Sequence, residues 1–239
     1  MTDHNESPFS RTEALLGPEG ISRLQQATMA VFGLGGVGGS CAEALARCGV
    51  GRLILVDHDR VQPSNLNRQV IALHSTVGML KTEALTNRLL DINPGLRIEA
   101  HPIFYGPDSQ DQLNLTRCDA VIDCVDTLEA KLLLALKAQE ADYIFLSAMG
   151  AGYRQNPLAF RFADIHETKT CPLARRMRKA CRERGINKLR VLYSEEEPMP
   201  RKTATQLLRP PPGSLPFVPP AAGLALAGEA VRLLLLKQA

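Results

Sequence analysis

The stretch AVFGLGGVGGSCAEALARCGVGRLILVDHDR, residues 30–60, decides the fold. An apolar run ending at Phe32 leads through a glycine-rich turn into a segment of helical periodicity, and a second apolar run ends before Asp57. Strand, glycine turn, helix and strand make a βαβ unit, whose glycines let the backbone approach phosphate oxygens at the helix N-terminus. We expect a nucleotide here rather than an empty tight turn, and its class stays open at this point. The glycines of the turn are Gly33, Gly35, Gly36 and Gly38.

Length and composition are those of an ordinary soluble globular protein. The chain has 239 residues, 45% hydrophobic and 22% charged, and can bury a large core. Its six cysteines form no CxxC pair and no signal peptide precedes them, which predicts reduced thiols in a cytoplasmic protein. The longest uncharged apolar stretch near the end, residues 215–228, is short and rich in proline and glycine. No transmembrane segment is therefore expected.

The order of the predicted elements favours a doubly wound, Rossmann-like α/β fold with a mainly parallel sheet. Strands are expected at residues 28–32, 52–57, 96–104, 118–124, 143–149, 158–163 and 189–193. Helices are expected as two short segments in 9–27, at 36–48, 78–92, 128–141 and 171–184, and from 219 onward. We expect a single domain, 8–239, in which a nucleotide-binding core, 8–152, precedes a C-terminal α/β extension, 153–239, with a loop or lid over 194–220; residues 1–7 are expected to be disordered.

Two classes of nucleotide compete for the glycine turn. A dinucleotide is favoured by Asp57, which lies 19 residues after Gly38, near the position where an acid binds ribose in nicotinamide enzymes. ATP is favoured by Arg68 in SNLNRQ and Lys81 in GMLKTEA, cations beyond the second strand where a triphosphate would lie. Asp126 in DCVDT closes a later strand with a carboxylate suited to Mg²⁺. Because a nicotinamide ring needs neither cations nor a metal, we predict ATP at the carboxyl ends of the strands.

The motifs GLGGVGG, DHD, SNLNRQ, GMLK and DCVDT resemble those of the ubiquitin-activating-enzyme-like (HesA/MoeB/ThiF) adenylyltransferases over residues 11–152. Further segments, FSRTEALLG, SAMGAG, CPLARRMRKACRERG, VLYSEEEP and GSLPFVPPAAGLALAGE, resemble the tRNA threonylcarbamoyladenosine dehydratases and extend the resemblance over nearly the whole chain. The resemblance implies ATP-dependent cyclisation of threonylcarbamoyladenosine in tRNA through an acyl-adenylate. Two alternatives stay open: adenylation of the C-terminus of a small ubiquitin-like or sulfur-carrier protein, and a nucleotide-binding module without catalysis.

The resemblance also implies roles for individual residues. The nucleotide would be cradled by Gly33, Gly35, Gly36 and Gly38, with the ribose on Asp57. The phosphates would be contacted by Asp59, Asn67, Arg68 and Lys81, and the metal by Asp126. Arg11 would reach the ATP phosphates of a neighbouring subunit across a two-fold interface, which predicts a homodimer. The expected catalytic residues are Arg11, Arg68, Lys81 and Asp126.

The cysteines argue against two chemistries of the superfamily. Members that transfer sulfur usually carry two CxxC pairs for structural zinc, and this chain has none, so no zinc is expected. Residues 194–220 contain no cysteine, which excludes a covalent thioester in that loop. Cys171, at the expected start of a helix, is the remaining candidate nucleophile, although ring closure needs no covalent relay. A monovalent cation, sulfur-relay helper proteins and peripheral membrane contact of the C-terminal helix stay open.

Positive charge is concentrated in one predicted helix. Residues 169–190 hold nine basic residues and one acid, which leaves 19 basic and 24 acidic residues elsewhere. The cations spread around most of helix 171–184, and their mutual repulsion favours a polyanionic partner over a merely basic surface. Together with the resemblance, this predicts tRNA binding through phosphates. The residues expected to bind tRNA are Arg175, Arg176, Arg178, Lys179 and Arg182.

Overall fold

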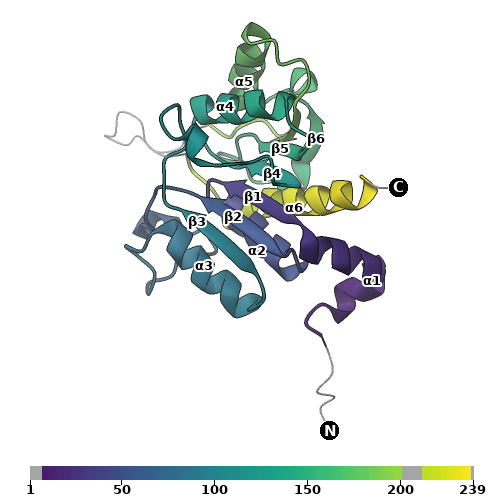
Figure 1. The fold of residues 1–239 in the computed structure, drawn as a ribbon. Helices are drawn as coiled ribbons and strands as arrows, with labels where there is room; N and C mark the ends of the chain where they lie inside the picture. The colour runs from purple at the N-terminus through teal and green to yellow at the C-terminus, as the bar shows by residue number, and fades with distance from the viewer. Residues whose placement is uncertain (1–6, 201–211, 238–239) are drawn as a thin grey trace.

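A seven-stranded sheet with helices on both faces organises the computed structural model, which describes residues 7–200 and 212–237 (Figure 1). The strands are β1 (Thr28–Phe32), β2 (Arg52–Val56), β3 (Arg97–His101), β4 (Ala120–Asp123), β5 (Ile144–Ala148), β6 (Phe160–Asp164) and β7 (Arg190–Ser194). Their spatial order is β3-β2-β1-β4-β5-β7-β6, and only β6 and β7 pair antiparallel. The predicted doubly wound, mainly parallel α/β fold is confirmed.

The helices connect these strands across both faces of the sheet. The α-helices are α1 (Ser10–Gln26), α2 (Gly38–Arg47), α3 (Lys81–Ile92), α4 (Leu128–Gln139), α5 (Pro172–Glu183) and α6 (Val218–Leu236). Short 3₁₀ helices are η1 (Pro63–Asn65), η2 (Gln110–Gln112), η3 (Pro157–Ala159) and η4 (Ile165–Glu167). The two short helices expected at the N-terminus are the halves of α1, which is kinked at Gly17 (φ 73°) just before Pro18.

Alternate residues of the buried strands face the two helical layers, as the period of a strand requires. On β1, Met29 and Val31 pack into the core formed with α2, α3 and α6. Ala30 and Phe32 point to the other face, where α4 and residues 103–118 form a second core. Both faces of the sheet are therefore buried, which explains why the sequences of the central strands are continuous apolar runs.

Two predicted boundaries near the site are wrong. The helix expected from residue 78 begins at Lys81, because Leu80 is extended (φ −60°, ψ 138°) and forms an antiparallel bridge with Arg60. The strand expected to run to residue 124 ends at Asp123, so Asp126 lies in the connection that follows rather than at the strand end. The first error arises because the bridge to Arg60, a contact distant in sequence, overrides the local helical pattern.

Helix α6 is long and apolar enough to cross a membrane by length and composition alone, yet 56% of that window is buried inside the protein. It packs along α2 (Figure 1), and Gly223 passes so close that a Cβ there would lie 2.2 Å from the carbonyl oxygen of Val37. Arg23 donates to the carbonyl oxygens of Leu234 and Leu235 at its end. This packing is that of a helix in a protein core.

One ion-pair cluster ties α6 to the sheet and predicts a pH-dependent stability. The buried Glu229 accepts hydrogen bonds from Arg232, with Nε 2.8 Å from Oε2, and from Arg190 on β7. The Arg232 hydrogen bond, aided by Arg190, outweighs the effect of burial and holds the pKa of Glu229 below its usual value. A carboxylate with a lowered folded-state pKa stabilises the protein above its unfolded pKa, and this stabilisation is lost as pH falls through the folded pKa.

We therefore expect Glu229→Gln to lower the free energy of unfolding by about 1–3 kcal/mol at pH 7. The difference from the parent should shrink as pH falls below about 4, the unfolded pKa of glutamate. Urea denaturation across this pH range measures both effects. Glu195→Gln, which removes an exposed ion pair with Arg161, is the matched control and should change stability by less than about 1 kcal/mol. A pH-independent difference at residue 229 would contradict the assignment.

Candidate nucleotide-binding site

A cavity of about 330 Å³ opens at the carboxyl ends of the central strands. Its walls include Gly33 after β1, Asp57 after β2, Cys124 after β4 and Ala151 after β5. The order of connection reverses between β1 and β4, which is the position where doubly wound sheets bind ligands. The volume lies within the range of small-molecule and cofactor sites.

The glycine turn is shaped by two close backbone approaches. Gly33 has φ 81°, and a Cβ there would lie 2.7 Å from the carbonyl oxygen of Cys124. A Cβ on Gly38 would lie 1.8 Å from the carbonyl oxygen of Gly33, so the turn closes only on glycine at this position. Gly33, Gly35 and Gly36 line the cavity, whereas Gly38 is not among its lining residues. Gly38 packs against Gly33, and the expectation that all four glycines cradle the nucleotide stays a prediction.

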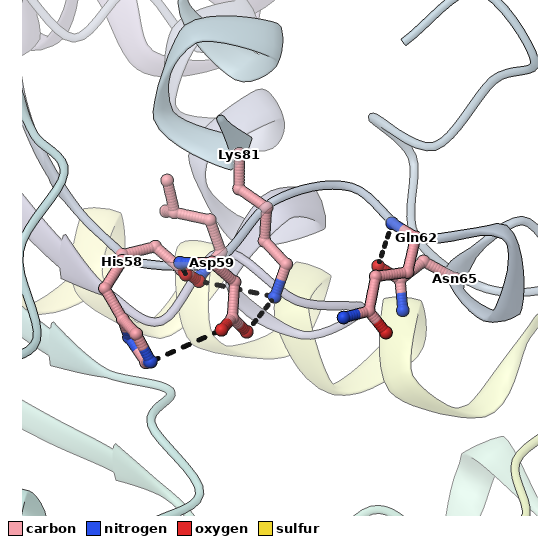
Figure 2. A network of polar contacts seen from close by, with 7 residues as sticks. His58, Asp59, Gln62, Asn65 and Lys81 are labelled. Atoms are coloured by element: carbon pink, nitrogen blue, oxygen red, sulfur yellow. Dashed lines mark hydrogen bonds and ion pairs between the residues drawn. The ribbon is translucent and has the colours of Figure 1, made fainter. Parts of the chain in front are cut away.

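Asp57, Asp59 and Lys81 form a polar group on the wall of the cavity. Figure 2 shows Asp59 and Lys81 of this group. Asp57 is buried, and its Oδ2 accepts a hydrogen bond from the Leu34 N–H at 2.6 Å, while Oδ1 accepts from the Asp59 N–H at 2.8 Å. The Lys81 ammonium lies 2.7 Å from Oδ2 of Asp59 and 3.7 Å from Oδ2 of Asp57. The start of α3 thus holds a buried lysine beside the glycine turn.

His58 lies on the same wall, but its group with Asp57 and Asp59 is a poor candidate for a metal site. One ligand atom each from Asp57, His58 and Asp59 lies within 4.8 Å of the others. The Lys81 ammonium, however, already pairs with both carboxylates and supplies the positive charge that a metal would bring. His58 Nε2 is 3.3 Å from Asp59 Oδ1, and its ring stands edge-on to Phe104.

Arg68 lines the cavity with a cation that pairs with no carboxylate among the described residues. One of its terminal nitrogens donates to the Ser64 carbonyl oxygen at 2.8 Å and to Asn67 Oδ1 at 2.9 Å. Burial lowers the pKa of this guanidinium below its usual value, although an arginine remains charged at neutral pH. The half-buried cation is therefore available to an anion in the cavity.

Asn67 does not line the cavity, contrary to its expected place at the phosphates. Its Nδ2 donates to the Ser214 carbonyl oxygen at 3.0 Å. The buried Asn65 and Gln69 line the cavity instead. The 3₁₀ turn η1 makes this choice: Asn65 ends it and accepts a hydrogen bond from the Gln62 N–H at 3.0 Å (Figure 2). The motif SNLNRQ offers two asparagines, and only the turn decides which faces inward.

Asp126 places an unpaired carboxylate on the cavity wall in the described part of the chain. It is exposed, it lines the cavity, and within residues 7–200 and 212–237 its side chain forms no hydrogen bond or ion pair. Carboxylate oxygens free of cationic partners are suitable ligands for Mg²⁺. The position agrees with the role implied by sequence, although it belongs to the connection after β4 and not to the strand.

The two remaining catalytic candidates lie away from this cavity. Arg11 is exposed on the first turn of α1. Phe9 contacts the position of Gly49, which precedes β2, so the start of α1 lies at the amino ends of the strands, opposite the cavity. Cys171 is buried at the N-cap of α5 and is not a lining residue. Cys124 does line the cavity, but burial raises the pKa of its thiol far above neutrality.

The basic helix α5 has one buried face, so the expectation that its cations spread around most of the helix is wrong. Ala174, Met177, Ala180 and Cys181 pack into the core beneath it. Arg178 also turns back to the protein and donates to the Thr168 carbonyl and hydroxyl oxygens, the latter at 2.8 Å. Four of the five predicted tRNA-binding cations are exposed on the outer surface: Arg175, Arg176, Lys179 and Arg182.

Two features of the site were missed by sequence reasoning. An apolar wall comes from Ile103, Phe104 and Tyr105, in an irregular segment after β3, because the strand expected to run to residue 104 ends at His101. A fully buried ion pair lies directly behind the cavity, with the Lys131 ammonium 3.0 Å from Asp123 Oδ2. In sequence, Lys131 looks like any polar residue of a helix, and nothing local indicates that it is buried.

Comparison with known proteins agrees with this geometry. Residues 9–239 match the ThiF family. The chain is 41% identical over 239 residues to the tRNA threonylcarbamoyladenosine dehydratase of Bacillus subtilis (strain 168), covering 95% of this chain and 94% of that protein. Its fold resembles crystal structures of the Escherichia coli tRNA N6-threonylcarbamoyladenosine dehydratase, at 28% identity over 96% of this chain and 94% of those chains. The TM-score is 0.88 for the complex with ATP and 0.89 for that with AMP. With matches of this extent in sequence and in fold, the chain belongs to the ThiF family.

Proposed function

We propose that this protein is an ATP-dependent dehydratase that cyclises threonylcarbamoyladenosine in tRNA. The observation that carries the proposal is the gathering of the glycine turn, Asp57, Arg68, Lys81 and Asp126 around one cavity. Relatives that are similar over nearly the whole chain are tRNA threonylcarbamoyladenosine dehydratases, and a similar fold has been crystallised with ATP and with AMP.

In the proposed reaction the threonyl carboxylate attacks the α-phosphorus of ATP, and pyrophosphate leaves. The neighbouring carbamoyl group then attacks the activated carbonyl carbon, which closes the ring and expels AMP. The net change in the nucleoside is the loss of one water. Arg68 and Lys81 would neutralise charge on the phosphates as the first step proceeds, and Asp57 would hold the ribose.

Mg²⁺ is the metal that the site fits best. The Asp126 carboxylate faces the cavity, and no cation pairs with it in the described part of the chain. A divalent cation held there would stabilise the charge of the leaving pyrophosphate. Asp59, by contrast, is already neutralised by Lys81 at 2.7 Å, so we place the metal on Asp126.

The extension after residue 152 would bind the tRNA. Its strands β6 and β7 join the same sheet as the nucleotide-binding core, which supports a single domain over residues 8–239. The exposed cations of α5 offer several phosphate contacts on one face of this extension. The described parts of the expected lid, residues 194–200 and 212–220, supply Pro212, Ser214 and Pro219 to the cavity wall; residues 201–211 lie outside the described residues. We further place the enzyme in the cytoplasm, as a homodimer.

We expect the combined change of Arg175, Arg176 and Arg182 to Gln to weaken tRNA binding by at least about tenfold in moderate salt. Each phosphate contact contributes about 0.7–0.9 to the slope of log K against log salt, so the slope should fall by about 2. Affinity for ATP should not change, because α5 does not line the cavity. Filter binding at several salt concentrations measures the slope.

The control for this experiment removes the same charge elsewhere. Arg47, Arg97 and Arg117 are arginines of α2, β3 and the loop before β4, distant from α5 along the sheet order. Changing these three to Gln should leave the tRNA salt slope close to that of the parent. If the α5 variant keeps the parent's slope, α5 is a basic surface helix that does not bind tRNA.

Pyrophosphate release separates the proposed function from the two alternatives. A dehydratase should release pyrophosphate with tRNA that carries threonylcarbamoyladenosine and not with unmodified tRNA. An enzyme that activates a small protein should require that protein's C-terminus, and a binding module should release none. Mass spectrometry of the tRNA nucleosides should show the modified nucleoside lighter by one water after incubation with enzyme and ATP. An unchanged nucleoside would exclude the proposal.

A further inference from the structure

Three fully buried polar side chains meet behind the nucleotide cavity. They come from three elements: Asp123 ends β4, Ser147 lies near the end of β5, and Lys131 lies in the second turn of α4. Each of the three has no exposed surface. The Lys131 ammonium is 3.0 Å from Asp123 Oδ2, and the Ser147 hydroxyl donates to the same oxygen at 2.6 Å.

The hydrogen bonds of this group join the ends of two strands. Lys131 Nζ also donates to the carbonyl oxygen of Ala148 at 2.6 Å, so one ammonium holds the last residues of both β4 and β5. The second carboxylate oxygen of Asp123, Oδ1, accepts from the Val125 N–H at 3.1 Å. The group is therefore satisfied on all sides, as a buried charge pair must be.

The ion pair closes a segment that supplies much of the cavity wall. Between Asp123 and Lys131 lie five lining residues: Cys124, Val125, Asp126, Thr127 and Ala130. The bond to Ala148 fixes the end of β5, and the chain after it supplies Ala151 and Gly152 to the wall. Asp126 has no hydrogen bond of its own in the described structure, so its place depends on the two ends of this segment.

The stability of the fold does not by itself account for such a pair. Buried ion pairs cost desolvation energy, and replacing both partners with neutral groups of similar volume is often neutral or stabilising. What the pair does provide is a rigid joint between two strand ends and a helix, at the base of an irregular connection. Rigid support of this kind is what a carboxylate needs to hold a metal and a phosphate in reactive geometry.

We propose that Lys131, acting through Asp123, is a positioning residue that holds Asp126 and its connection in the geometry for the metal-bound triphosphate. This inference rests on the proposed function, in which Asp126 holds Mg²⁺. Most other lining residues, among them those of the glycine turn, Lys81 and residues 103–105, lie outside this segment. Loss of the ion pair should therefore affect turnover and Mg²⁺ dependence more than the affinity for ATP alone.

The test removes both charges together, since removing one would leave the other buried and unpaired. The double variant Asp123→Asn with Lys131→Gln should unfold at nearly the parent's denaturant midpoint. Its kcat should fall on the order of tenfold, and the Mg²⁺ concentration for half-maximal rate should rise several-fold, because a misplaced group of this kind can cost up to ~10²-fold. If the double variant has the parent's kcat and Mg²⁺ dependence as well as the parent's stability, the pair is only structural and the proposal fails.

A milder variant covers the case in which the double variant does not fold. Ser147→Ala removes one hydrogen bond to Asp123 and should raise the half-maximal Mg²⁺ concentration by about twofold. An unchanged value would overturn the proposal. Glu229→Gln is the matched control, because it alters the ion pairs of a buried carboxylate outside the cavity and should leave the Mg²⁺ dependence as in the parent.

A binding measurement separates this proposal from the proposed function. Titration calorimetry of ATP, with and without Mg²⁺, reports how far the metal tightens ATP binding without any turnover. The parent should show a gain in affinity with Mg²⁺, and the double variant should lose most of it while still binding metal-free ATP. An equal gain in both proteins would overturn the positioning role. A parent that binds Mg-ATP but never cyclises modified tRNA would refute only the proposed function.

Discussion

Lys81→Ala is expected to lower pyrophosphate release at least ~10²-fold, which is the typical cost of removing one group that stabilises developing charge. Lys81 begins α3 with a buried ammonium on the wall of the cavity, 2.7 Å from Asp59 and 3.7 Å from Asp57. When a triphosphate enters, this cation can exchange the exposed Asp59 for a phosphate oxygen. Initial rates with saturating modified tRNA measure the loss, and circular dichroism checks that the fold is kept.

Asp126→Ala should cause a loss of similar size by a different route, because it removes the carboxylate assigned to the metal. In that variant, raising Mg²⁺ should not restore the rate. Lys137→Ala is the control for the loss of a lysine charge: the Lys137 ammonium pairs with Asp111 and does not line the cavity, so activity should stay near the parent's. Pyrophosphate release at the parent rate in both the Lys81 and the Asp126 variants would refute the site.

The second large effect concerns Arg11, which we expect to act on the site of a partner subunit. Within its own chain, Arg11 lies at the amino ends of the strands, whereas the cavity opens at their carboxyl ends. It can therefore contact ATP only from a second copy of the chain. The exposed Leu15, on the same helix, would belong to the dimer interface. Arg11→Ala should be nearly inactive although every residue lining its own cavity is unchanged.

Subunit mixing tests this arrangement directly. Arg11→Ala and Lys81→Ala dimers, each nearly inactive, should regain roughly a quarter of parental activity after exchange, because about half of the dimers are then mixed and each mixed dimer has one intact site. Mixing Lys81→Ala with Asp126→Ala is the control. Both residues line the same chain's cavity, so every site in that mixture lacks one of them and no activity should return. If exchange is demonstrated and the first mixture also stays inactive, Arg11 does not act across the interface.

The βαβ unit was predictable because its signals are local. Alternation of apolar runs, four glycines at fixed spacing and an acid after the second strand all lie within residues 30–60. The predicted strand over residues 28–32 matches β1, and the strand expected over 52–57 ends one residue early as β2. Gly33 has φ 81°, a backbone conformation that the glycine itself makes predictable, because glycine adopts positive φ at no steric cost.

Sequence was a poorer guide where two similar residues compete for one position. Asn65 and Asn67 stand in the same motif, and the 3₁₀ turn η1 directs Asn65 into the cavity and leaves Asn67 bonded to Ser214. Likewise, Arg178 lies among the cations of α5 yet bonds to Thr168. Spacing along a helix shows which residues share a face, but the partners brought to that face come from distant parts of the chain.

The sequence by itself determined the doubly wound fold, the nucleotide turn and the class of the chain, because periodicity, glycine spacing and charged motifs are properties of short segments. Only the tertiary structure decided that Lys131 is buried against Asp123 and that the start of α1 lies opposite the cavity. These facts depend on contacts between strands and helices that are far apart in the chain. A side chain's desolvation and pairing are set by its neighbours in space, and those exist only once the sheet has assembled.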